Sequence, residues 1–180
     1  MTPGTLVLLH SPYARSAAWG DLPEMLRLHG LDVVTPDVPD SSGPRYVARA
    51  SLVISATAPT APLVLVARGG AGPLLPGIAL AQRAAHRKVG GYVFLDAELP
   101  RLGHGHAHDH DEPSVPVPPD WPEAPCGYLR TTTRGAQGTG GDAGTADPAL
   151  REARLRGWSV VEQPPKTSLA RTLNDLIATL

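Results

Sequence analysis

The stretch PLVLVARGGAGPLLPGIALAQRAA, residues 62–85, decides the fold class. Residues 62–67 form a nearly continuous apolar run, which is typical of a parallel strand covered on both faces. Glycine then predominates in 69–72, and residues 73–85 have the pattern of a helix with its prolines in about the first turn. A strand, a glycine-rich turn and a helix in this order predict one unit of a parallel α/β sheet.

The same alternation of strand and helix patterns continues on both sides of this stretch. Apolar runs predict strands at 5–10, 32–37, 62–67, 90–97, 126–133 and 158–163. Helical patterns occupy 20–30, 45–58, 73–85, 147–157 and 168–180. Such alternation requires right-handed crossovers and predicts an α/β fold with a doubly wound, mostly parallel sheet of six strands. We expect one domain over 1–180, with an irregular loop rich in histidine and proline at about 98–125.

Local signals mark the ends of several helices. Asp21 and Asp147 stand at N-cap positions, and Gly30 and Gly157 stand at the ends of the same two helices. β-Branched residues lower the helix propensity of 45–58. The final helix carries one apolar stripe at helical spacing, formed by Leu169, Leu173, Leu176, Ile177 and Leu180.

Composition and charge limit the classes of partner. At 180 residues, 42% hydrophobic and 18% charged, the chain fits one ordinary globular domain. A formal net charge of -1 gives no electrostatic case for binding nucleic acid or an anionic membrane. The single cysteine, Cys126, excludes an internal disulfide and suits a reducing compartment. Because the sequence has no signal-peptide pattern and no membrane-spanning run, we expect a cytoplasmic protein. We also expect it to bind a small molecule or a peptide, and the sequence allows a homo-oligomer.

Several segments together resemble the α/β-hydrolase superfamily. The opening is similar to the family's first strand, helix and second strand: LVLLHSPYARSAAWGDLPEMLRLHGLDVVTPDVPD (6–40). The stretch APLVLVARGGAGPLLPGIA (61–79) resembles the nucleophile elbow, usually written V-G-H-S-x-G-G and followed by a helix. Three later segments continue in the family's order: KVGGYVFLDAELP (88–100), VPVPPDWPEAPCGYLR (115–130) and RGWSVVEQ (156–163). The resemblance leaves out 101–112, is to a branch of small bacterial hydrolase-like proteins, and implies an α/β-hydrolase-like core without a full lid.

The resemblance also implies that the catalytic machinery is incomplete. Alignment of the elbow motif places Ala67, Arg68 and Gly69 where the family has glycine, histidine and the serine nucleophile. The family's base, a histidine after the last strand, is missing because no histidine follows His110. Asp96, which ends the fourth predicted strand, matches the acid that some members keep there. The elbow residue normally has a positive φ, and glycine at this position relieves the resulting strain.

Candidate site residues stand at the ends of predicted strands, which meet at one crevice of a doubly wound sheet. Gly69 and Gly70 are candidates for an anion or oxyanion hole, with Arg68 as a fixed cation. The alternative is an inherited tight turn with a surface arginine. A dinucleotide fingerprint fits less well, because Leu75 stands where its third glycine should be, although Asp96 lies at about the right distance for a ribose contact.

The loop after the first strand supplies further candidates. His10, Ser11 and Tyr13 lie where the family places its oxyanion loop, so they are candidates to contact a substrate carbonyl, and His10 to act as a general base. The alternative is that the His-Ser-Pro turn only shapes the loop. Asp96 is similarly a candidate carboxylate base or, alternatively, a cap bonded to neighbouring amides. Asp37 also ends a predicted strand and should line the same crevice.

A run of alternating histidines is the candidate metal site. His104, His106, His108 and His110 lie in the stretch LGHGHAHDHDE, beside three acidic residues. Imidazoles and carboxylates suit Zn²⁺, Ni²⁺ or Cu²⁺. Structural zinc sites usually join ligands from separate elements, so adventitious chelation is the alternative. We expect no other cofactor.

These observations leave four hypotheses about function. The first is a non-hydrolytic enzyme of bacterial specialised metabolism, an isomerase, epimerase, cyclase or lyase, using His10 or Asp96 to move a proton. The second is a non-catalytic pseudo-hydrolase that captures a small carboxylate or carbonyl ligand or docks a protein. The third is a metal-dependent role of the His-rich loop, and the last is an esterase that uses Ser11.

Overall fold

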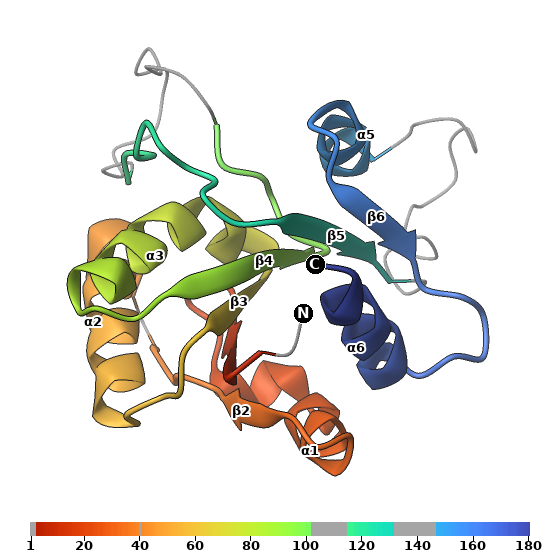
Figure 1. The fold of residues 1–180 in the computed structure, drawn as a ribbon, viewed down its shortest axis with the longest axis horizontal. Coiled ribbons are helices and arrows are strands. Elements are labelled where there is room, and N and C mark those ends of the chain that lie inside the picture. Colours follow the sequence, from red (N-terminus) through yellow and green to blue (C-terminus); the bar gives the residue numbers. More distant parts are fainter. Residues whose placement is uncertain (1–2, 40, 102–114, 132–146) are drawn as a thin grey trace.

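The predicted strands form one parallel sheet at the centre of the molecule (Figure 1). The computed structural model describes residues 3–39, 41–101, 115–131 and 147–180. In this part of the chain six strands pair in the order β2-β1-β3-β4-β5-β6, and every pairing is parallel. The strands are β1 Thr5–Leu9, β2 Asp32–Val34, β3 Leu63–Arg68, β4 Val89–Leu95, β5 Cys126–Arg130 and β6 Ser159–Glu162. The predicted sheet and its six strands are confirmed.

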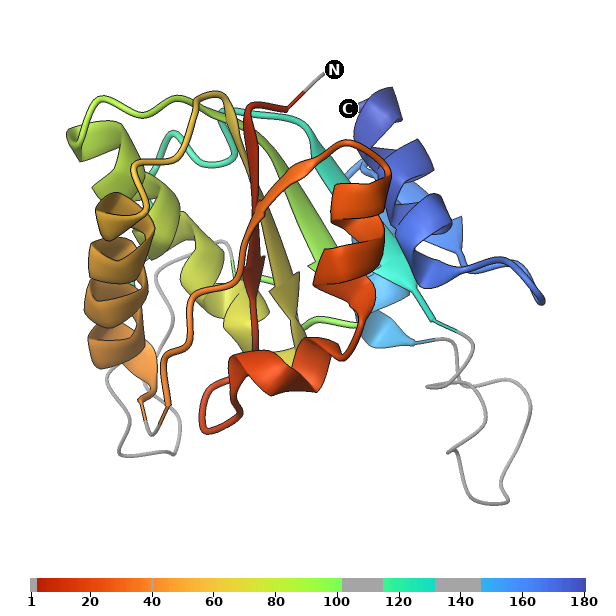
Figure 2. The same ribbon diagram turned by 90° about the horizontal axis from the view of Figure 1, so that it is seen from below.

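Helices cover both faces of the sheet, as Figure 2 shows. They are η1 Ser16–Trp19, α1 Leu22–Leu28, α2 Gly43–Ala56, η2 Gly69–Leu74, α3 Leu75–Ala84, α5 Pro148–Leu155 and α6 Leu169–Thr179. Residues of α2, α3 and α5 enter one buried hydrophobic cluster, whereas those of α1 and α6 enter the other. This division between the two faces is the doubly wound arrangement. In the described part of the chain no helix is long and apolar enough to cross a membrane.

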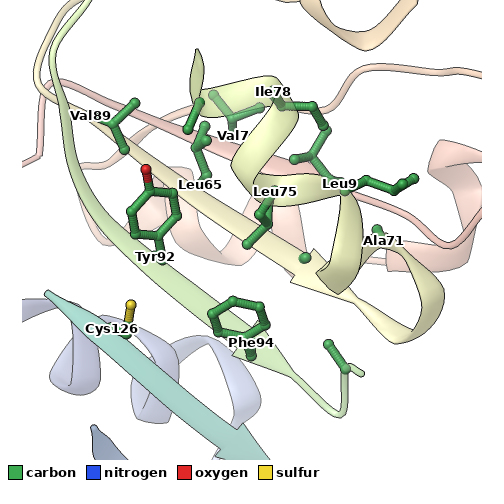
Figure 3. Close-up of a cluster of buried hydrophobic side chains, with 14 of the residues drawn as sticks. Val7, Leu9, Leu65, Ala71, Leu75, Ile78, Val89, Tyr92, Phe94 and Cys126 are labelled. Carbon is green, nitrogen blue, oxygen red and sulfur yellow. The ribbon is translucent and has the colours of Figure 1, made fainter. Parts of the chain in front are cut away.

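Alternate residues of a strand enter different clusters. Val7 and Leu9 of β1 pack with Leu75 and Ile78 of α3 (Figure 3), whereas Leu6 faces the cluster of α1 and α6. Successive side chains of a strand point to opposite faces, so a strand covered on both faces must be apolar at nearly every position. This requirement explains the continuous apolar runs in the sequence.

Some predicted boundaries are wrong for local reasons. The strand predicted at 32–37 ends at Val34, because Pro36 has no N–H with which to continue the pairing with β1. The helix predicted at 73–85 begins as the 3-10 turn η2, and α3 starts only at Leu75, with Pro76 in its first turn as expected. α2 forms despite its β-branched residues because burial of its apolar face outweighs their lower propensity.

The predicted helix caps are confirmed in part. Asp147 accepts the N–H of Ala149 at 3.0 Å, and Gly30 and Gly157 have positive φ where their helices end. Asp21 occupies an N-cap position without a side-chain cap bond, because its own backbone is already helical after η1. The apolar stripe of α6 faces the core as predicted: Leu173, Leu176 and Ile177 are buried, and Leu169 and Leu180 are partly buried against them.

Candidate functional site

Three left-handed residues stand at one end of the sheet, where the carboxyl ends of β1, β3 and β4 lie side by side. We call this end the carboxyl edge. Tyr13 follows β1 with φ 62°, Gly69 follows β3 with φ 56°, and Asp96 follows β4 with φ 46°. Positive φ costs a residue other than glycine about 1–3 kcal/mol, and such strain concentrates at functional sites. The elbow conformation expected of Gly69 is therefore confirmed, and the carboxyl edge is the candidate site.

His10 is buried, and both of its ring nitrogens are hydrogen-bonded to the backbone. The N–H of Val38 donates to Nε2 at 3.0 Å, so Nε2 carries the lone pair. The hydrogen is then on Nδ1, which donates it to the carbonyl oxygen of Ser11 at 2.8 Å. The Tyr46 hydroxyl donates to the carbonyl oxygen of His10 at 2.6 Å. These bonds favour the interpretation that His10 shapes the loop, because neither nitrogen is left to act as a general base.

Asp37 anchors the same loop and does not act alone. Its carboxylate accepts the N–H of Ser16 at 2.7 Å, which lowers the pKa of Asp37 below the usual 3.8. Nε2 of His10 lies 3.9 Å from the same oxygen, Oδ1, and a guanidinium nitrogen of Arg15 lies 3.8 Å from the other, Oδ2. Asp37 therefore fixes the start of η1 at the rim of the carboxyl edge.

At the elbow, the side chain of Ser11 lies directly against Gly69. The hydroxyl of Ser11 donates to the carbonyl oxygen of Arg68 at 3.0 Å. A β carbon on Gly69 would lie 2.3 Å from this hydroxyl oxygen, and one on Gly70 would lie 3.4 Å from Cδ of Pro12. The loop after β1 therefore closes over the elbow from one side.

The loop after β4 closes over the elbow from the other side. The N–H of Glu98 donates to the carbonyl oxygen of Gly69 at 3.1 Å. A β carbon on Gly72 would lie 1.8 Å from the carbonyl oxygen of Glu98, so only glycine fits at 72. The glycine cluster thus forms a tight turn in which Gly72 is required for steric reasons.

Arg68 and Tyr13 are held at the rim of the site. One guanidinium nitrogen of Arg68 donates to the carbonyl oxygen of Ala18 at 3.0 Å, and Cζ lies 5.8 Å from the centre of the Trp19 ring. Tyr13 is 68% exposed, and its hydroxyl donates to the Ser42 hydroxyl at 2.9 Å. Arg68 is therefore a half-buried cation in a fixed place.

Asp96 is nearly buried and bound to the neighbouring strand end. One carboxylate oxygen accepts the N–H of Thr131 at 2.8 Å, and the other accepts the Thr131 hydroxyl. The N–H of Asp96 donates to the carbonyl oxygen of Leu129 at 2.9 Å. These bonds are those of a strand-end cap, the alternative considered for this residue.

The four histidines of the candidate metal site, at 104, 106, 108 and 110, lie outside the described residues. Among the residues that the structure does describe, no group of three or more His, Cys, Asp or Glu side chains could hold a metal ion.

Sequence reasoning missed the partners that define these roles. Val38, Thr131 and Trp19 carry no motif, and the first two lie 28 and 35 residues from the side chains that they bind. One feature of the site could be read from the sequence. Because Pro12 has no N–H, this residue of the loop after β1 cannot donate a hydrogen bond to a ligand at the elbow.

Comparison with known proteins identifies the fold. No protein-family model and no curated protein matches this chain. Solved structures do match over nearly its whole length. An extracellular α/β-hydrolase from a Paenibacillus species has a TM-score of 0.63 and 15% identity, with 98% of both chains covered. The chain has an α/β-hydrolase-like fold.

Two thioesterases share this fold. The RedJ thioesterase from the prodiginine biosynthetic pathway of Streptomyces coelicolor has a TM-score of 0.60 and 13% identity, covering 99% of this chain and 91% of that one. The NocB thioesterase domain, solved as a covalent complex with a fluorophosphonate nocardicin G analogue, has a TM-score of 0.53 and 18% identity, covering 99% and 94%. At these identities the likeness establishes the fold alone.

Proposed function

We propose that this α/β-hydrolase-fold protein is a non-hydrolytic binding protein that captures a small carbonyl or carboxylate ligand at the carboxyl edge. The observation that carries the proposal is the elbow itself. Gly69 keeps the left-handed turn, with φ 56°, but has no side chain to attack a substrate. Acyl transfer needs a nucleophile at this turn.

The surrounding groups support binding rather than covalent chemistry. Both ring nitrogens of His10 are bonded to the backbone, so His10 has no free nitrogen to activate a nucleophile. In α/β-hydrolases an oxyanion hole takes one N–H from the residue after the nucleophile and one from the oxyanion loop, which corresponds here to the loop after β1. Pro12 is the loop residue that faces Gly70, and it has no N–H to offer.

Arg68 is the group that would hold the ligand. Its guanidinium carries five N–H donors, and one of these donates to Ala18. The stacked position over Trp19 keeps the cation half-buried beside the elbow, where its attraction for a carbonyl or carboxylate oxygen is less screened than on the surface.

Two measurements test the proposal. The protein is incubated with p-nitrophenyl acetate, and intact mass and nitrophenolate release are followed; we expect neither an acyl adduct nor turnover above the buffer rate. Backbone ¹⁵N–¹H resonances are then followed during titration with acetate and propionate. We expect saturable shifts at Gly69 and Gly70 that are lost in Arg68→Gln and kept in Arg171→Gln, a control on an exposed face of α6. An acyl adduct, or shifts that do not depend on Arg68, would overturn the proposal.

A second candidate is an isomerase, epimerase, cyclase or lyase that uses Asp96. It is favoured by the position of this carboxylate, nearly buried at the end of β4 on a strained, left-handed backbone. The test is deuterium uptake from D₂O into small ketones and N-acetylated amino acids. Uptake by the wild-type protein that is absent in Asp96→Asn would favour this candidate over simple binding.

A further inference from the structure

The space of the missing nucleophile is occupied by another side chain. A β carbon on Gly69 would lie 2.3 Å from the hydroxyl oxygen of Ser11 but 3.6 Å from its β carbon. Only the oxygen therefore conflicts with a side chain at 69. The hydroxyl of Ser11 and any side chain at the elbow compete for one position.

The orientation of this hydroxyl is set by its neighbours. The hydrogen of the Ser11 hydroxyl is donated to the carbonyl oxygen of Arg68 at 3.0 Å. The backbone of Ser11 is fixed as well, because its carbonyl oxygen accepts the N–H of Ala14 at 3.0 Å and Nδ1 of His10 at 2.8 Å. A serine hydroxyl has one hydrogen and two lone pairs. With its hydrogen committed inward, Ser11 offers lone pairs at the elbow.

We propose that Ser11 takes the place of the elbow side chain and acts there as a hydrogen-bond acceptor, so that the site prefers a carbonyl ligand that also carries an N–H, an amide or peptide group, over the corresponding ester. This inference rests on the proposed function and specifies the ligand class for the same site. An ester has only acceptor oxygens, so its bridging oxygen would face the lone pairs of Ser11 without a hydrogen between them.

The steric part is tested with a double-mutant cycle on the equilibrium constant for unfolding. Gly69→Ala adds backbone strain and forces the Ser11 hydroxyl to rotate away from Arg68, whereas in the Ser11→Ala background only the strain remains. We expect the factor by which Gly69→Ala raises the unfolding constant to be about fivefold smaller in that background, which is equivalent to about one hydrogen bond. Gly20→Ala is the matched control, because Gly20 has nearly the same φ, 57°, with nothing within 4 Å of its β carbon. It should have the same effect in both backgrounds, and equal effects of Gly69→Ala in both would overturn the proposal.

The ligand preference is tested with N-methylacetamide and methyl acetate, which differ in shape only slightly and by one N–H donor. The ¹⁵N–¹H resonances of Gly69 and Gly70 are followed during titration with each. We expect N-methylacetamide to bind about fivefold more tightly than methyl acetate to the wild-type protein, and the two to bind about equally to Ser11→Ala.

The outcomes separate this inference from the proposed function. Equal binding of both probes to the wild-type protein would overturn the role of Ser11 and leave carbonyl capture intact. Shifts with neither probe would overturn the role of Ser11, and the absence of shifts with acetate and propionate as well would overturn the proposed function. Release of methanol from methyl acetate would overturn the non-hydrolytic function. The ratio of the affinities for N-methylacetamide and methyl acetate would still test the role of Ser11.

Discussion

His10 and Val38 are joined by a hydrogen bond that crosses 28 residues of sequence, with the N–H of Val38 donating to Nε2 at 3.0 Å. The other ring nitrogen of His10, Nδ1, donates to the carbonyl oxygen of Ser11. The hydroxyl of Ser11 then donates to the carbonyl oxygen of Arg68. A continuous set of hydrogen bonds thus ties the loop after β2 to the ends of β1 and β3 at the carboxyl edge.

His10→Ala should therefore lower the stability of the folded protein. The change leaves the N–H of Val38 without a partner and opens a cavity beside Tyr46, so we expect the free energy of unfolding to fall by about 2–4 kcal/mol. Tyr46→Phe removes only the bond to the carbonyl oxygen of His10 and should cost about 1 kcal/mol. Urea denaturation measures both. A His10→Ala protein of unchanged stability would mean that the imidazole does not hold the loop.

The glycine cluster should tolerate substitution at one position and not at another. Gly72→Ala would place a β carbon 1.8 Å from the Glu98 carbonyl oxygen, a backbone atom that cannot rotate away. We expect a loss of about 3 kcal/mol in the free energy of unfolding. At Gly70 the nearest atom, on Pro12, would lie 3.4 Å away, so Gly70→Ala should change stability by less than about 1 kcal/mol. Similar losses for the two variants in urea denaturation would contradict the close approach of Glu98 to Gly72.

The carboxylate of Asp37 should make stability depend on pH in the acid range. The N–H of Ser16 lowers the pKa of Asp37 in the folded protein below its usual 3.8. The charged form is then favoured by folding, so its contribution is complete above pH 3.8 and is lost as the pH falls through the lower, folded pKa. Asp37→Asn should accordingly destabilise the protein more at pH 7 than at pH 3 in urea denaturation. An equal loss at both pH values would show that the charge has no part in it.

Cys126 should be unreactive in the folded protein. Burial raises the pKa of its thiol to about 12, and the thiol lies 3.7 Å from the carbonyl oxygen of Ala124. At pH 8 only about one thiol in 10⁴ would be ionised, and the thiolate is the reactive form. We expect labelling by a disulfide reagent at pH 8 to be slow in buffer and immediate in concentrated urea. Rapid labelling without urea would mean that β5 opens or that the thiol is accessible.

Much of this fold follows from patterns that the sequence displays locally. Continuous apolar runs predict strands covered on both faces, and the order of strands and helices restricts the sheet to a doubly wound form. The resemblance to the nucleophile elbow likewise predicted a positive φ at Gly69, a conformation that glycine adopts without strain. The boundaries at Val34 and Leu75 were less predictable, because strand pairing stops just before Pro36 and α3 is preceded by the 3-10 turn η2, which contains Pro73.

By itself the sequence determined the fold class, since this depends on residue identity and local spacing. Its resemblance to the nucleophile elbow predicted a positive φ at Gly69 and the absence of a nucleophilic side chain there. The tertiary structure alone decided the roles at the carboxyl edge. Which nitrogen of His10 carries its hydrogen depends on Val38, and the space that a side chain at Gly69 would need is occupied by the hydroxyl of Ser11, 58 positions earlier in the sequence. Hydrogen-bond partners and steric exclusion act over a few ångströms in space, and only folding brings residues so distant in the chain to that separation.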